Sequence, residues 1–259
     1  MDITNLISVE KFMAGIPVDI EDKNTKKGKL CSIYPVRLKE IAQIGVKNFY
    51  SYLNIFTLKK EDIDDYLAKE GIEEELTPFQ FLLVMIQADP QYFVTAQEAF
   101  KLFLHEPSIT ILKNNEAIVL GDINEERVID NEKFEVIKQI VEASHTLDTE
   151  SADMRLDNPS DAKAAQIIKK LKEGRKAREK AKKSSNLEFS DLVASLAAGG
   201  NGLNIINIWD LTYYAFNDQF KRMQMREEYE NTYRSLLAGA DPKKVKIHYW
   251  IDTIQDKKD

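Results

Sequence analysis

The side chains best able to do chemistry are scattered through this sequence. Three histidines, His105, His145 and His248, stand far apart, whereas a zinc site needs His or Cys ligands at close paired spacing. The single cysteine, Cys31, has no second cysteine or histidine beside it to make its thiol reactive. We therefore expect the histidines to make local hydrogen bonds and Cys31 to be a small buried residue. The sequence predicts no metal site and no cofactor.

The glycine-rich and acidic stretches do not form a recognisable active site either. The run from Gly199 to Gly202 follows no clear strand and lacks the Lys-Ser/Thr pair of a phosphate-binding loop, so we interpret it as a hinge. Asp22, Asn24 and Gly28 partly match the residue pattern of a calcium-binding loop, but four lysines between 23 and 29 disfavour a bound cation there. No acidic residue sits in an apolar stretch that would adapt it to acid–base catalysis. The prediction is a protein that is not an enzyme.

Composition indicates a globular protein without an obvious nucleic-acid or membrane role. The chain has 259 residues, of which 43% are hydrophobic and 31% charged, with a net charge of −7. A negative overall field disfavours general attraction to nucleic acid or anionic membranes. The first residues do not resemble a signal peptide. The most apolar run, 79–88, has about half of the roughly 20 residues that a bilayer span needs. We expect a soluble, cytosolic protein.

Local signals predict a mainly α fold with a small β-hairpin. Residues 1–29 read as an irregular arm, and 30–147 as a helical domain that opens with a strand at 30–34. Apolar residues at helical spacing follow Pro35 as far as Phe56, and a second helix covers about 59–68. Thr77-Pro78 and Asp89-Pro90 are helix starts, and Asn131 is expected to cap a further helix. Two β-branched runs around a polar turn predict a hairpin over 108–121.

A charged linker, 148–187, is expected to follow this domain and to contain a basic helix over 161–183. Its basic surface would comprise Lys169, Lys170, Lys172, Arg175, Lys176 and Arg178. Three roles stay open for it: a solvated, semi-rigid spacer, a contact for an acidic protein partner, or a nucleic-acid contact. The stretch lacks interleaved aromatic residues for base stacking, which weighs against nucleic acid.

The C-terminal domain, 188–259, is expected to be small and helical, with a long helix after residue 208 and a glycine stop at Gly239. Tyr213, Phe216, Phe220 and Met223 follow each other in steps of three, four and three, which places them on one helix face. This face is either the core of the domain or a docking surface, because so small a domain struggles to bury so many large side chains. The docking alternatives are the N-terminal domain, a second copy of the chain in a homo-oligomer, or a client protein. The candidate partner-binding residues are Trp209, Tyr213, Phe216, Phe220, Met223 and Trp250.

The same stretch, WDLTYYAFNDQFKRMQMREEYENTYRSLLAGADPKKVKIHYW from Trp209 to Trp250, resembles the C-terminal segments of tail assembly chaperones of long-tailed bacteriophages and prophages. The resemblance lies in the aromatic helix start, the central Gln-Phe pair, the Leu-Ala-Gly-Ala turn, the Lys pair and the terminal Trp. The run IYPVRLKEIAQIG and the helical body after it also look like a phage tail-gene product. The likeness covers 203–255 best and 30–146 loosely, and the size and the basic helix depart from the family pattern.

The resemblance implies a non-enzymatic chaperone in the host cytoplasm. Such a protein would bind the tape measure protein and recruit tail tube subunits during tail assembly. A structural virion component, such as a tail, baseplate or connector protein, is the main alternative. A nucleic-acid-binding accessory protein acting through 163–183 is a weaker one.

Overall fold

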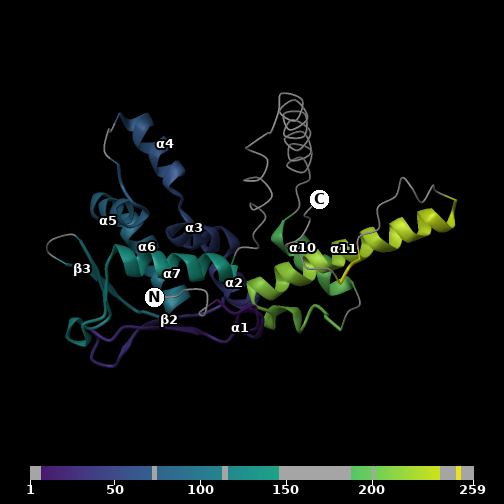
Figure 1. Cartoon of the computed structure of the whole chain (residues 1–259), viewed down its shortest axis with the longest axis horizontal. Helices are drawn as coiled ribbons and strands as arrows, with labels where there is room; N and C mark the ends of the chain where they lie inside the picture. Colours follow the sequence, from purple (N-terminus) through teal and green to yellow (C-terminus); the bar gives the residue numbers. More distant parts are fainter. Residues whose placement is uncertain are drawn as a thin grey trace. The chain divides into compact units, whose positions relative to one another are not determined.

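A computed structural model describes residues 7–71, 75–112, 116–145, 188–199, 202–239 and 249–251. The fold is mainly α with two small antiparallel sheets, which confirms the predicted class (Figure 1). The chain forms two compact units. Unit 1 contains residues 1–146 and 209–217, and unit 2 contains 147–208 and 218–259.

Unit 1 is built from helices with two short sheets. Its helices are α1 (Val9–Ala14), α2 (Leu38–Ile44), α3 (Val46–Thr57), α4 (Lys60–Glu70), α5 (Pro78–Ala88), α6 (Pro90–Leu104), the 3-10 helix η2 (Ile123–Glu125) and α7 (Asn131–His145). Its strands are β1 (Val18–Glu21), β2 (Lys29–Ile33), β3 (Ile109–Ile111), β4 (Ile118–Leu120) and β5 (Val128–Ile129). In unit 2 the described elements are α10 (Phe189–Ala198) and most of α11 (Tyr213–Leu237), which the 3-10 helix η3 (Ile208–Asp210) precedes.

Most predicted helix starts are confirmed, because short-range hydrogen bonds specify them. Before α5, the Thr77 hydroxyl accepts the Gln80 N–H at 3.2 Å, and the Gln80 side chain accepts the Thr77 N–H at 2.9 Å. These two bonds form a capping box. Asp89 caps α6 by accepting the Gln91 N–H at 2.8 Å. For α7 the predicted cap was wrong by one residue, since Asp130 accepts the Lys133 N–H at 2.9 Å and Asn131 is already helical.

The N-terminal residues differ from the expected irregular arm. Ser8 caps α1 by accepting the Lys11 N–H, and Gly15 ends that helix in the left-handed region at a φ of 70°. β1 then pairs antiparallel with the predicted strand, β2. The single helix expected after Pro35 is divided into α2 and α3 at Gly45, whose φ of 87° is incompatible with a continuous helix.

The hairpin is confirmed, and it carries a third strand. β3 and β4 pair antiparallel with Thr110 opposite Val119, and β5 adds to the other edge of β4. β5 is only two residues long, which left no alternating pattern to detect.

Aromatic side chains fill the core of unit 1. Phe56 of α3 lies 5.1 Å from Phe100 and 5.6 Å from Phe103 of α6, measured between ring centroids. Phe134 of α7 lies 5.9 Å from Phe56 and 5.0 Å from Phe79 of α5. All five rings are almost fully buried. Because each Phe buries roughly 150–250 Å², this cluster is a dominant stabilising element of unit 1.

Candidate interaction surfaces

Residues 209–217, called the docked segment below, belong to unit 1 although they follow α10 of unit 2 in the sequence. Their main chain runs antiparallel to the residues that lead into α2. The Leu38 N–H donates to the Leu211 carbonyl at 2.9 Å, and the Tyr213 N–H donates to the Val36 carbonyl at 2.7 Å. Between these two bonds, Arg37 and Thr212 form an isolated antiparallel bridge. The docked segment is therefore held by backbone pairing before any side chain is considered.

Thr212 joins the docked segment to α1 and also begins α11. Its hydroxyl donates to the Phe12 carbonyl at 2.8 Å and accepts the Ala215 N–H at 3.1 Å. The side chain is only 2% exposed. One hydroxyl thus satisfies an orphan N–H in the first turn of α11 and fixes that turn to the end of α1.

Aromatic contacts cover the two sides of this backbone pairing. The Tyr213 ring meets Phe49 edge-on at 5.0 Å, and its hydroxyl lies 3.2 Å from that of Tyr50. Burial raises the pKa of Tyr213 above its ordinary value, as does the neighbouring Tyr50. Tyr214 packs against Phe12 at 5.7 Å. The docked segment is therefore anchored through both α1 and α3.

The predicted partner-binding stripe is consequently divided. Phe216 is 2% exposed, Tyr213 is largely covered, and Trp209 is half-buried in η3. Phe220 and Met223 continue the stripe into unit 2. Both are half-buried, and the Met223 sulfur lies 3.5 Å from where a Cβ on Gly199 would stand, at the end of α10. The first half of the stripe therefore packs within unit 1, and docking on the N-terminal domain was one of the alternatives that the sequence left open.

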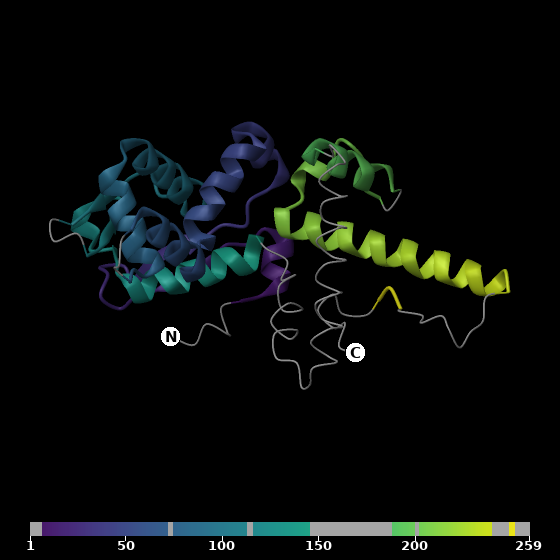
Figure 2. The same ribbon diagram turned by 90° about the horizontal axis from the view of Figure 1, so that it is seen from above.

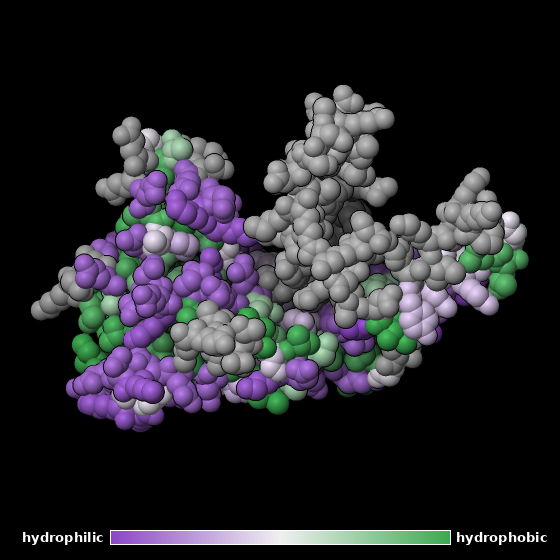
Figure 3. Space-filling view, in the orientation of Figure 1, coloured by the Kyte–Doolittle hydropathy of each residue, from purple (hydrophilic) through white to green (hydrophobic). Residues whose placement is uncertain are grey.

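A more exposed group of side chains lies toward the other end of α11. Tyr229 stacks with Tyr233 at 6.4 Å and meets Tyr249 edge-on at 5.6 Å, and we call these three the terminal aromatic cluster. Tyr233 is 51% exposed and Leu237, one turn further on, is 73% exposed. Figures 1 and 2 show α11 as one continuous helix, and Figure 3 shows hydrophobic surface at its far end.

The terminal aromatic cluster is not among the predicted partner-binding residues, although Tyr229 and Tyr233 are four residues apart, the spacing of neighbours on one helix face. Of the predicted residues, Trp250 adjoins this cluster in the sequence and is half-buried. The predicted basic surface, Lys169, Lys170, Lys172, Arg175, Lys176 and Arg178, lies outside the described residues.

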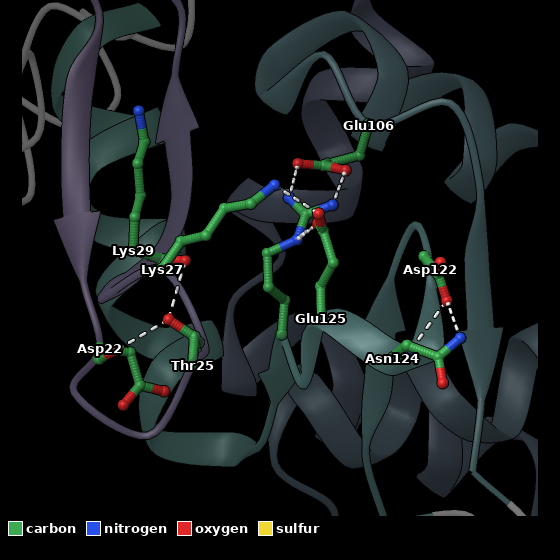
Figure 4. Close-up of polar contacts among 9 residues, drawn as sticks. Asp22, Thr25, Lys27, Lys29, Glu106, Asp122, Asn124 and Glu125 are labelled. Carbon is green, nitrogen blue, oxygen red and sulfur yellow. Dashed lines mark hydrogen bonds and ion pairs between the residues drawn. The ribbon is translucent and has the colours of Figure 1, made fainter.

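A polar network fastens the β1–β2 turn to the β3–β5 sheet (Figure 4). Arg127 pairs with both carboxylate oxygens of Glu106, one of them at 2.9 Å, and its Nε lies 3.0 Å from Glu125. The other Glu125 oxygen accepts from Lys27 of the turn at 2.6 Å. Arg127 and Glu106 are mostly buried, so the planar guanidinium satisfies charges that water barely reaches. We interpret this network as structural.

Asp22, the first residue of the stretch that resembled a calcium loop, forms an ion pair with a lysine of the same chain. Lys133 approaches its carboxylate at 2.6 Å, and this contact is the largest cause that lowers the pKa of Asp22. In the ranges that the structure describes, no group of three or more His, Cys, Asp or Glu residues is placed to hold a metal ion.

His145 and Cys31 have the structural roles that the sequence predicted. The Val36 N–H donates to Nε2 of His145 at 3.0 Å, so the proton of the neutral ring lies on Nδ1, which is 2.9 Å from the Val141 carbonyl. Complete burial lowers the pKa of His145 to about 4. Burial likewise raises the pKa of Cys31 to about 12, so its thiol is inert. His105 stacks on Tyr34 at 3.6 Å, and His248 lies outside the described residues.

Part of the chain matches a known family model. Residues 180–255 match the family model of the YomV second domain, a family derived from a Bacillus prophage. The match supports a phage protein. It covers residues 180–208 and 218–255 of unit 2 together with the docked segment, and the rest of unit 1 lies outside it. No curated protein and no solved structure matches the chain. None of the described helices is both long enough and apolar enough to cross a bilayer.

Proposed function

We propose that this protein is a non-enzymatic bacteriophage assembly protein that acts as a tail assembly chaperone. In this role it binds the tape measure protein and tail tube subunits in the host cytoplasm while the tail is built. The proposal rests on one coincidence. The residues that match a phage-derived family, 180–255, contain the stretch that resembles tail assembly chaperones, 203–255.

The exposed end of α11 supplies a physical basis for client binding. A tape measure protein is a long helical chain, so its apolar stripes need partners until the tail tube covers them. Tyr233 and Leu237 are one helical turn apart and largely exposed. Tyrosine and other large apolar side chains on a regular helix are favoured at the centres of protein interfaces. We assign client contact to this end of α11 and to the terminal aromatic cluster.

A test combines purified virions with direct binding. The full-length protein is mixed with the tape measure protein of the same phage, and the complex is isolated by size-exclusion chromatography. A chaperone is expected to form this complex and to be absent from virions by quantitative mass spectrometry. Presence in virions at a fixed copy number would support a structural component instead. DNA or RNA binding that weakens steeply with salt would support the nucleic-acid role.

A pair of matched variants locates the contact. Tyr233→Asp with Leu237→Asp should weaken client binding at least tenfold without lowering helix content, because both side chains are exposed. Val84→Asp with Val94→Asp is the control, since these residues of α5 and α6 are 49% and 51% exposed in unit 1. Equal effects of the two double variants would remove the assignment to α11.

A further inference from the structure

We infer that the surface of unit 1 that holds the docked segment is a recognition site for that segment, and that it accepts the same segment from a second copy of this chain. This acceptor surface consists of α1, the residues leading into α2, and α3. Two copies would exchange residues 209–217, each completing the other's unit 1. The inference concerns self-association and does not depend on the proposed chaperone role.

The docked segment makes the contacts of a bound peptide. Two main-chain hydrogen bonds set its register, at Leu211 and Tyr213, and a buried hydroxyl at Thr212 adds a third bond to the acceptor surface. Addition of an extended segment to an exposed backbone edge, with side chains seated on either side, is a recurring mode of peptide recognition. All the bonds are made within a few residues, so they move together with the segment.

Chain connectivity does not require the segment and its acceptor surface to belong to the same copy. Residues 147–208 separate the docked segment from the end of α7, and beyond Asn217 the chain passes again into unit 2. A connection of this length, unlike a short loop, places no tight limit on which acceptor surface the segment reaches.

Concentration decides between the two arrangements. A covalent tether presents a segment to its own acceptor surface at an effective concentration on the order of 1 mM. Dilute protein is therefore closed on itself. The fraction of exchanged dimer rises as the concentration of chains approaches this effective concentration. At lower concentrations, a disulfide that forms only in the exchanged dimer would accumulate and make the exchange measurable.

The antiparallel bridge offers a position for this trap. The bonds from Leu38 to Leu211 and from Tyr213 to Val36 flank Arg37 and Thr212, which makes these two a non-hydrogen-bonded pair. The Cα atoms of such a pair are about 4.5 Å apart, within the range that a disulfide spans. Both side chains also approach the same residue, Gly15, so they lie on one side of the pairing.

The experiment mixes two full-length proteins, one carrying Arg37→Cys and the other Thr212→Cys, at about 0.5 mM, half of the effective concentration. After mild oxidation, linked dimers are measured by non-reducing gel and the 37–212 bridge by peptide mass spectrometry. Cys31 stays in place because it is buried and common to all samples. Val94→Cys mixed with Thr212→Cys measures random collision, since Val94 is 51% exposed on α6, outside the acceptor surface.

The expected result is a 37–212 linked dimer that forms at least tenfold faster than the 94–212 dimer. A single chain carrying both Arg37→Cys and Thr212→Cys should form an intramolecular bridge at micromolar concentration. Equal rates for the two mixtures would overturn the exchange. If the single chain with both substitutions formed no intramolecular disulfide, residues 209–217 would not lie against the residues leading into α2. The inference would then be wrong.

Discussion

The start and the far end of α11 carry similar side chains in opposite surroundings. Tyr213 lies against Phe49 and Tyr50, and Phe216 is almost wholly buried, all within unit 1. Near the other end, Tyr233 stacks on Tyr229 and is about half exposed, and Leu237 is largely exposed. Helical spacing of aromatic residues is therefore no guide to burial within this helix. Burial at its start comes from α1, α3 and the residues leading into α2, all of which are distant in the sequence.

The largest expected contrast compares truncations at the two ends. Phe216→Ala should lower the free energy of unfolding by about 3–4 kcal/mol, because it leaves a cavity in a packed region. Tyr233→Ala should change it by less than about 0.5 kcal/mol, because the side chain is half-exposed. Urea unfolding followed by circular dichroism measures both. A large loss in Tyr233→Ala would show that the far end is also packed, and the contrast would fail.

Acid should weaken the start of α11 and spare its far end. Val36 links His145 to the docked segment, since its N–H donates to His145 and its carbonyl accepts from Tyr213. The pKa of His145 is about 4 in the folded protein, against roughly 6.5 when unfolded. The unfolded chain therefore binds a proton between these values that the folded chain excludes. Stability should fall by roughly 3 kcal/mol as the pH drops from 6.5 to 4.

Two single-tryptophan proteins localise this effect. Trp250→Phe leaves Trp209 in the docked segment, and Trp209→Phe leaves Trp250 beside the terminal aromatic cluster. Urea midpoints from Trp209 fluorescence should fall in the acid range, and those from Trp250 should move less. In a His145→Gln background the fall reported by Trp209 should largely vanish. Persistence of the fall in that background would assign it to other groups.

A smaller effect measures how closely Thr212 approaches the end of α1. Gly15 and Gly71 both end helices in the left-handed region, with φ of 70° and 72°. A Cβ on Gly15 would stand 3.3 Å from the Thr212 methyl, whereas one on Gly71 would meet nothing within 4 Å. Each Gly→Ala change should cost about 1 kcal/mol for backbone strain. Gly15→Ala should cost a few tenths more in urea unfolding, and equal losses would mean that the Thr212 contact is loose.

The smallest expected difference concerns single hydroxyl groups. Tyr213→Phe removes the 3.2 Å contact with the Tyr50 hydroxyl and should cost about 0.5 kcal/mol. Tyr233→Phe at the exposed end should have no measurable effect on thermal unfolding. The Tyr50→Phe, Tyr213→Phe double variant should lose no more than the worse single one. Additive losses would show that the two hydroxyls act separately.

Local signals made much of unit 1 predictable from the sequence. Thr77-Pro78, Asp89-Pro90 and the hairpin are specified by residues within a turn of one another, so composition and spacing were enough. β5 and α1 were missed because they are short. The partly buried pair of Arg127 with Glu106 joins a strand edge to the end of α6, and neither residue is distinguished by its neighbours in the sequence.

The candidate surfaces were predictable only in part, for a related reason. The stripe from Tyr213 to Met223 was found by its period, but its division between two units depends on the pairing of residues 36–38 with 211–213. No local pattern encodes a contact across that distance in the chain. The exposure of Tyr233 and Leu237 has the same origin, since it reflects which elements fold near them.

Val36 brings the last residue of α7 and the first residue of α11 to a single position, through its N–H and its carbonyl. The chain from 146 to 212 thus leaves and re-enters unit 1 at one place, in the manner of a domain insertion. Doubling the length of such an inserted segment costs only about 0.6 kcal/mol of loop-closure entropy. The chain between residue 146 and α10 is therefore free to lengthen or shorten during evolution while the fold that carries it stays the same.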